Sequence, residues 1–268
     1  MIKDITLGQF FPGNSIVHRL DPRTKILLTI LYIVALFCAK NYVSYAFMLL
    51  VLITCVRLST IRVKSLVRGI KPLIIIIVFT AILNMFFTKG TPVADVWLIR
   101  RITWEGLRTA LFMVLRIMML VSGTFLLTYT TSPMALTDGL EQLLNPLKKI
   151  RVPVHELAMM MSIALRFIPT LIEETDKIMS AQKARGADFE TGNILQRAKA
   201  MIPLLVPLFI SAFRRADELA TAMESRCYHG GEGRTRLKQL HLVRRDYMAL
   251  LLGLLVIACV ILLARFGV

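Results

Sequence analysis

Five runs of mostly apolar residues limit what this chain can fold into. Each reads as a helix, because it is too long for a strand and holds no internal proline. A helix that crosses a bilayer needs about 20 such residues, and the first two runs are slightly short. With 56% hydrophobic residues and a mean hydropathy of +0.66, the 268-residue chain is predicted to be an all-α polytopic membrane protein. The five predicted spans are 26–39, 42–56, 72–87, 106–130 and 247–264.

The basic residues, which give the chain a net charge of +16, lie mostly between the apolar runs. They therefore fit loops that orient membrane spans better than a surface for nucleic acid. The linker 57–71 holds five Lys/Arg and no acid, so it is predicted to be cytoplasmic. The N-terminus and 132–246 then also lie on the cytoplasmic side of the cell membrane, and the C-terminus outside. The loop 88–106 departs from this scheme, because it is predicted to be outside yet holds three basic residues.

The chain divides into three parts on these grounds. Residues 1–131 are predicted to form a membrane domain of four spans, and 247–268 a last transmembrane helix. Residues 132–246 are predicted to form a cytoplasmic domain, because apolar stretches alternate there with charged residues.

Long helices are expected inside that cytoplasmic part. Ser132 and Pro133 are typical of a helix start, and an amphipathic helix follows them. Two long helices are then predicted over 152–186 and 194–226. One alternative stays open: 154–172 is apolar enough to cross the membrane, and two extra crossings would leave the termini on the same sides.

The two long predicted helices end on an arginine between small residues: Ala184, Arg185 and Gly186 at one end, and Ser225, Arg226 and Cys227 at the other. One interpretation is an ordinary helix stop, since arginine complements the helix dipole and a following glycine permits the left-handed conformation. Cys227 stands where that glycine is expected, so a helix stop alone does not explain both ends. Gly230 and Gly231 follow closely, however, and would end the second helix by themselves.

The other interpretation of the arginine ends is docking. A guanidinium group among small side chains can enter a groove and bind carboxylates through two hydrogen bonds. The helices also match along their length, because at an offset of 41 residues Arg185 coincides with Arg226 and Asp176 with Asp217. The sequence thus predicts two similar docking ends.

No motif for catalysis, metal binding or energy capture is evident. The stretch GGEGRTR, 230–236, does not have the spacing of a phosphate-binding loop. The four cysteines show no close pairing, and no two histidines stand at helical ligand spacing. We therefore expect no metal, no cofactor and no enzymatic activity of its own. Two similar docking ends would fit an external motor with two similar subunits.

Other residues have less specific interpretations. Arg116 lies deep in the fourth span, where a charge is costly, and contact with backbone carbonyls or a mechanistic role are equally expected. Pro203 and Pro207 would allow bending of the second long helix. Asp176 and Asp217 precede their arginines by nine residues, where solvated charge is the default and a coupling contact the lesser option.

Together these features resemble the transmembrane (T) component of energy-coupling factor transporters, a branch of ABC importers that includes EcfT, CbiQ and BioN. The resemblance rests on the paired arginine ends, on HRLDPRTKILL at 18–28 and on LRFIPTLIEETDKIMSAQKARG at 165–186. It covers essentially the whole chain. The second end departs from the family pattern, because Ser225 and Cys227 replace alanine and glycine.

The resemblance implies a function and a set of partners. The helices that end at Arg185 and Arg226 would dock on two ABC ATPase subunits, which bind the ATP. They would pass the ATP-driven motion to a separate substrate-binding membrane protein, the S component, which takes up a vitamin or a metal ion. A rival from another class is a membrane scaffold or integral enzyme whose cytoplasmic helices bind a partner that is not an ATPase.

Overall fold

A computed structural model describes residues 10–88, 103–189, 191, 193–231 and 239–265. Within these residues the chain is helical and has no extended strand, which confirms the predicted all-α class. Two 3-10 turns, η2 (Lys71–Leu73) and η3 (Asn145–Ile150), join longer helices. The helices are α1 (Pro22–Cys38), α2 (Tyr42–Ser59), α3 (Val63–Ile70), α4 (Ile74–Phe87), α5 (Trp104–Thr130), α6 (Pro133–Leu144), α7 (Val154–Ala184), α8 (Ile194–Glu224) and α9 (Arg244–Arg265).

The chain folds into two compact units. The first, which we call the membrane unit, comprises Gly8–Gly139 and Leu240–Val268. The second, the crossed-helix unit, includes Leu140–Gln239. The predicted division at 131/132 and 246/247 concerns the side of the membrane on which each segment lies, and it stays a prediction.

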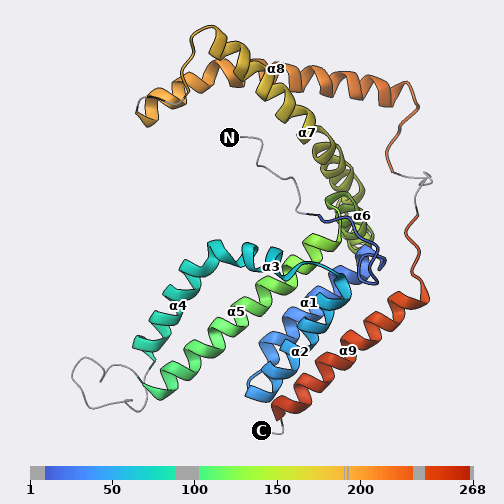
Figure 1. Ribbon diagram of the computed structural model, residues 1–268. Coiled ribbons are helices and arrows are strands. Elements are labelled where there is room, and N and C mark those ends of the chain that lie inside the picture. The colour runs from blue at the N-terminus through green and yellow to red at the C-terminus, as the bar shows by residue number, and fades with distance from the viewer. Residues whose placement is uncertain (1–9, 89–102, 190, 192, 232–238, 266–268) are drawn as a thin grey trace. The chain divides into compact units, whose positions relative to one another are not determined.

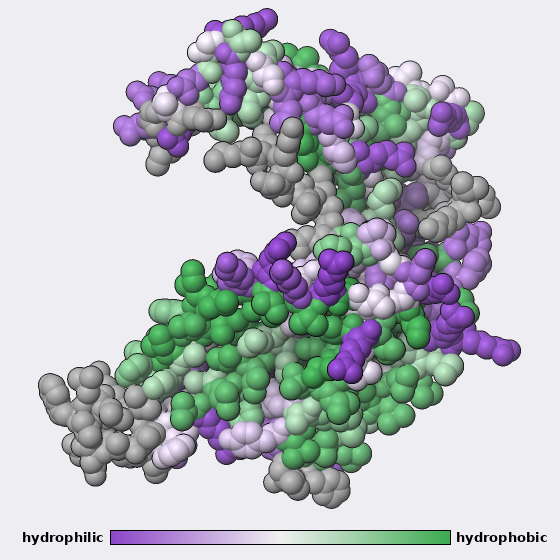
Figure 2. Space-filling model, in the orientation of Figure 1, coloured by the Kyte–Doolittle hydropathy of each residue, from purple (hydrophilic) through white to green (hydrophobic). Residues whose placement is uncertain are grey.

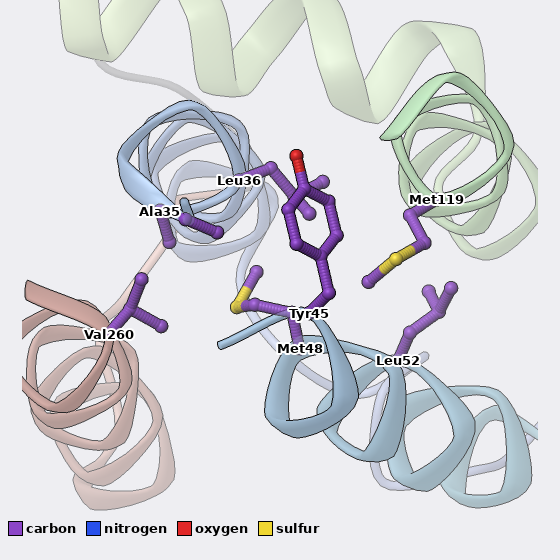
Figure 3. Packing of buried hydrophobic residues seen from close by; sticks show 8 residues of the cluster. Ala35, Leu36, Tyr45, Met48, Leu52, Met119 and Val260 are labelled. Carbon is purple, nitrogen blue, oxygen red and sulfur yellow. The ribbon is translucent and has the colours of Figure 1, made fainter. Parts of the chain in front are cut away.

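In the membrane unit, α1, α2, α4, α5 and α9 run alongside one another (Figure 1). Their exposed side chains are largely apolar, as expected for a surface in contact with lipid (Figure 2). A buried cluster joins four of the helices: Ala35 and Leu36 of α1, Tyr45, Met48 and Leu52 of α2, Met119 of α5 and Val260 of α9 (Figure 3).

Polar caps fix the starts of α1 and α9 together. Asp21 caps α1, accepting a hydrogen bond from the backbone N–H of Arg23 at 2.9 Å. The carboxylate of Asp246, at the start of α9, accepts from the backbone N–H groups of Asp21 and Val243, each at 2.9 Å. The Arg23 guanidinium also donates to the Leu240 carbonyl at 2.9 Å. The family-like segment 18–28 therefore supplies a polar joint between the first and last spans.

Among the described residues, six helices are long and apolar enough to cross a membrane by length and composition. Four belong to the predicted spans, in α2, α3 through α4, α5 and α9, and the other two are α7 and α8. The predicted first span forms α1, which at 17 residues is shorter than these six. The polytopic prediction is confirmed, and the length of α7 admits the alternative in which 154–172 crosses.

A candidate docking site at two helix ends

The end of α7 is built by a Schellman motif. Gly186 has a left-handed backbone with φ +87°, a conformation that glycine adopts at little cost. The N–H of Gly186 donates to the Lys183 carbonyl, and the N–H of Ala187 donates to the Gln182 carbonyl, both at 3.0 Å. These two hydrogen bonds satisfy carbonyl groups that the last turn would otherwise leave open. Arg185 is thereby held directly before the left-handed residue.

The end of α8 is built by the same motif although it has no glycine. Cys227 takes the left-handed conformation, with φ +56°. The N–H of Cys227 donates to the Glu224 carbonyl at 2.9 Å, and the N–H of Tyr228 donates to the Met223 carbonyl at 3.1 Å. The argument that a helix stop alone does not explain both ends does not hold, because the Cys227 backbone adopts the left-handed conformation expected of glycine. Gly230 does not end the helix, since α8 has already ended at Glu224.

Arg185 and Arg226 therefore occupy the same position in two equal backbone motifs. Both arginines are exposed, and neither forms an ion pair with any residue that the structure describes. The flanking residues Ala184, Gly186, Ser225 and Cys227 are exposed as well. The Ser225 hydroxyl donates back to the Ala222 carbonyl of its own helix at 3.1 Å, so it presents a small surface similar to that of alanine. Each end leaves a guanidinium group accessible among small side chains.

A polar contact joins the two helices where they cross (Figure 1). The Glu174 carboxylate of α7 accepts a hydrogen bond from the Arg215 guanidinium of α8 at 2.8 Å and another from the Ser211 hydroxyl. The hydrogen bond from Ser211 makes the largest contribution to lowering the pKa of Glu174 below its usual value, and Arg215 lowers this pKa further. Glu174 lies 11 residues before Arg185, and Arg215 lies 11 residues before Arg226. The crossing contact thus joins equivalent positions of the two helices.

Sequence reasoning missed this contact, although the offset of 41 residues contains it: Glu174 and Arg215 are 41 apart and carry opposite charges. It singled out Asp176 and Asp217 instead. Asp176 is half-buried and Asp217 exposed, and neither carboxylate forms an ion pair within the described residues. Their backbone carbonyls accept from the hydroxyls of Ser180 and Thr221, at 2.7 and 2.9 Å, as in many helices.

The two ends differ in how they are fastened. Beyond Arg226, the Tyr228 hydroxyl donates to the Met159 sulfur of α7 at 3.1 Å. Gly231 lies so close to the His155 ring that a methyl group there would be 2.2 Å from it. Beyond Arg185, the Ala187 N–H donates to the Gln182 carbonyl of α7 itself. The end of α8 is therefore attached to the first half of α7, and the end of α7 is closed by its own backbone.

The remaining predicted residues lie away from the helix ends. Arg116 donates to the Tyr45 hydroxyl at 2.8 Å and to the Ala39 carbonyl at 3.4 Å, which supports the structural interpretation of this charge. Its guanidinium also stands 5.7 Å from the centre of the Phe37 ring. Pro203 and Pro207 lie inside α8, which continues through both as one helix of 31 residues.

No group of three His, Cys, Asp or Glu side chains is placed to hold a metal ion within the residues that the structure describes. The four cysteines are free thiols, and that of Cys227 is exposed. The exposed guanidinium groups of the two ends offer recognition by charge and shape.

Comparison with known proteins identifies the family. The family model described as CbiQ, cobalt transport protein, matches residues 13–237. A relative in Thermosediminibacter oceani, named energy-coupling factor transporter transmembrane protein EcfT, is 57% identical over 99% of both chains. Relatives with the same name in Clostridium kluyveri and Bacillus subtilis are 54% and 48% identical, and each alignment covers 99% of this chain. They cover 98% and 100% of those relatives. The chain therefore belongs to the CbiQ family, as a transmembrane component of the energy-coupling factor transporters.

Proposed function

We propose that the chain couples two ABC ATPase subunits to a substrate-binding S component, for uptake of a vitamin or another micronutrient. Arg185 and Arg226 are the docking residues, one for each ATPase, and ATP is bound by those partner subunits. The observation that carries this proposal is the equality of the two ends: one backbone motif, built twice, presents an exposed arginine at the same position.

The chemistry of the ends favours a groove lined by carboxylates. A guanidinium group offers a planar fork of donors that matches a carboxylate, and small flanking residues let it enter without steric hindrance. Two equal ends suit two similar partners better than one, since a single partner would need two equal sites. This favours a pair of ATPases over a scaffold for an unrelated protein.

An apolar face of α8 supports contact with a second membrane protein. Leu205, Val206, Phe209, Ile210 and Phe213 line an open groove, and all five are more than half exposed. Exposed apolar patches of this kind are typical of interaction sites. In the proposed arrangement the S component covers this face, and the crossing contact at Glu174 passes the movement of the arginine ends to it.

A double charge reversal, Arg185→Glu with Arg226→Glu, tests the docking. We expect the variant to insert into membranes but to lose copurification of both ATPases and all uptake, because each carboxylate groove then meets a negative charge. Arg197→Glu, an exposed arginine near the start of α8, is the matched control and should retain both. Copurification of the ATPases with the double variant would refute the proposal. Capture of a partner without ATP-binding motifs by the unaltered chain would favour the scaffold.

A further inference from the structure

A cleft in the membrane unit is lined by basic residues that have no role in the proposed coupling function. It encloses about 540 Å³ and lies between the N-terminal segment, the turn after α2 and the start of α3. Arg62, Lys64 and Arg68 line it, all three exposed, and the described residues that line it include no acid. None of the three forms an ion pair with another described residue. Among the described residues, the cleft therefore gathers three positive charges without a compensating acid.

The part of the cleft formed by Phe11 and His18 is held by several contacts. The Phe11 ring packs edge-on against Tyr129 of α5 with their centres 5.3 Å apart, and the Phe11 N–H donates to the Tyr129 carbonyl at 3.0 Å. Both nitrogens of His18 are occupied, at 2.6 Å from the Ser15 hydroxyl and 3.0 Å from the Phe11 carbonyl. On the other side, the Tyr129 hydroxyl donates to the Ser65 carbonyl of α3 at 3.3 Å. The cleft thus has an aromatic wall and a cationic rim.

Its location is at one end of the membrane spans. Figure 1 shows α3 turned away from the direction of α4, and hydrophilic side chains border the apolar surface of this unit in Figure 2. The helix α3 is amphipathic, because Val63 and Val67 are exposed apolar residues while Lys64 and Arg68 are exposed cations. Such a helix lies where lipid chains meet lipid headgroups.

We propose that this cleft binds the phosphate of an anionic phospholipid headgroup. The guanidinium groups of Arg62 and Arg68 match two oxygens of a phosphate, and Lys64 adds a point charge. Basic pockets at the ends of membrane helices bind such headgroups. The exposed Val63 and Val67 then give the acyl chains an apolar surface beside the bound headgroup. The proposal does not depend on which proteins dock at Arg185 and Arg226.

The test is native mass spectrometry of the full-length protein with phosphatidylglycerol and with phosphatidylcholine. The unaltered chain should retain phosphatidylglycerol preferentially. Each basic residue near an anionic lipid surface contributes about a fivefold factor in affinity. The triple variant Arg62→Gln/Lys64→Gln/Arg68→Gln should therefore bind phosphatidylglycerol about 100-fold more weakly. The triple variant Lys148→Gln/Lys149→Gln/Arg151→Gln loses the same charge on exposed residues and should bind as before.

Further measurements distinguish a bound lipid from free phosphate, from a general charge effect and from a protein partner. Inorganic phosphate at millimolar concentration should not displace the lipid; if it binds with equal strength, the ligand is free phosphate and the lipid proposal fails. An equal loss in both triple variants would mean only a general charge effect, and loss of ATPase copurification without loss of lipid would assign the cleft to a protein partner. The variant Arg62→Lys/Arg68→Lys keeps the charges that orient the spans, and it should bind more weakly than the unaltered chain but more tightly than the neutral variant.

Discussion

The ends of α7 and α8 have the same backbone motif and an arginine at the same position, but they differ in the residue after the arginine and in their further contacts. Gly186 holds the left-handed position in one and Cys227 in the other, with the same pair of hydrogen bonds. The end of α8 is also attached to the first half of α7 through Tyr228. The feature common to both is the position of the arginine. The two ends thus place Arg185 and Arg226 equivalently although different residues follow them.

The largest expected effect is the protection of the two helix ends from thiol labelling when the ATPases dock. Cys227 is exposed and should react with a maleimide in the isolated chain. Docking should slow that reaction at least about tenfold, because residues around an interface anchor are screened from water. The variant Gly186→Cys in a Cys227→Ser background places the same thiol on the other end. Equal protection at both positions would confirm that both ends dock. Protection at one position alone would show that the two ends are not equivalent.

Valine substitutions at the two left-handed positions should destabilise the two helix ends to different extents. A non-glycine residue in this conformation costs about 1–2 kcal/mol, and a β-branched side chain is especially poor there. Gly186→Val should therefore speed amide hydrogen exchange in the last turn of α7 about tenfold. Cys227→Val should have a smaller effect on α8, since cysteine already has a Cβ atom. An equal effect at both ends would show that Cys227 is not strained.

The crossing contact should affect coupling more than docking. Glu174→Ala removes a partly exposed ion pair with a coupling energy of about 0.5–1 kcal/mol. We expect the ATPases to copurify as before while uptake falls more than ATP hydrolysis does. The neighbouring exposed Glu173→Ala should leave both unchanged. The exchange Glu174→Arg/Arg215→Glu should restore part of the uptake, and parallel loss of uptake and hydrolysis in all variants would argue against a coupling role.

The smallest effect is expected from making the two ends alike. Cys227→Gly relieves left-handed strain, although a glycine also loosens the unfolded chain, so the net stabilisation is about 0.5 kcal/mol. Amide exchange in the last turn of α8 should slow about twofold, and docking should not change. Weaker docking by this variant would assign a direct role to the cysteine side chain.

The elements and the two ends were predictable from local information. Apolar runs identify the membrane helices, and two arginines among small residues identify the ends. The left-handed Cys227 was not predictable, because propensity argues against cysteine there and only the hydrogen bonds of the final turn reveal it. The contact of Glu174 with Arg215 depends on how the two helices cross. The sequence alone does not distinguish this pair from other oppositely charged residues on the same helices. The sequence signal for this contact was the pair of opposite charges at the offset of 41 residues that relates the two helices.

The place of the crossing contact has a geometric consequence. At about 1.5 Å per residue, 11 residues make an arm of roughly 16 Å, and both arginines stand at the ends of equal arms that start from one joint. For two rigid arms of equal length, a single angle sets the distance between the tips, which has an upper bound of about 33 Å. In the proposed arrangement each tip holds one ATPase, and neither arm is a longer lever than the other. A displacement of either tip changes the same crossing angle, so the two ATPases would share one degree of freedom.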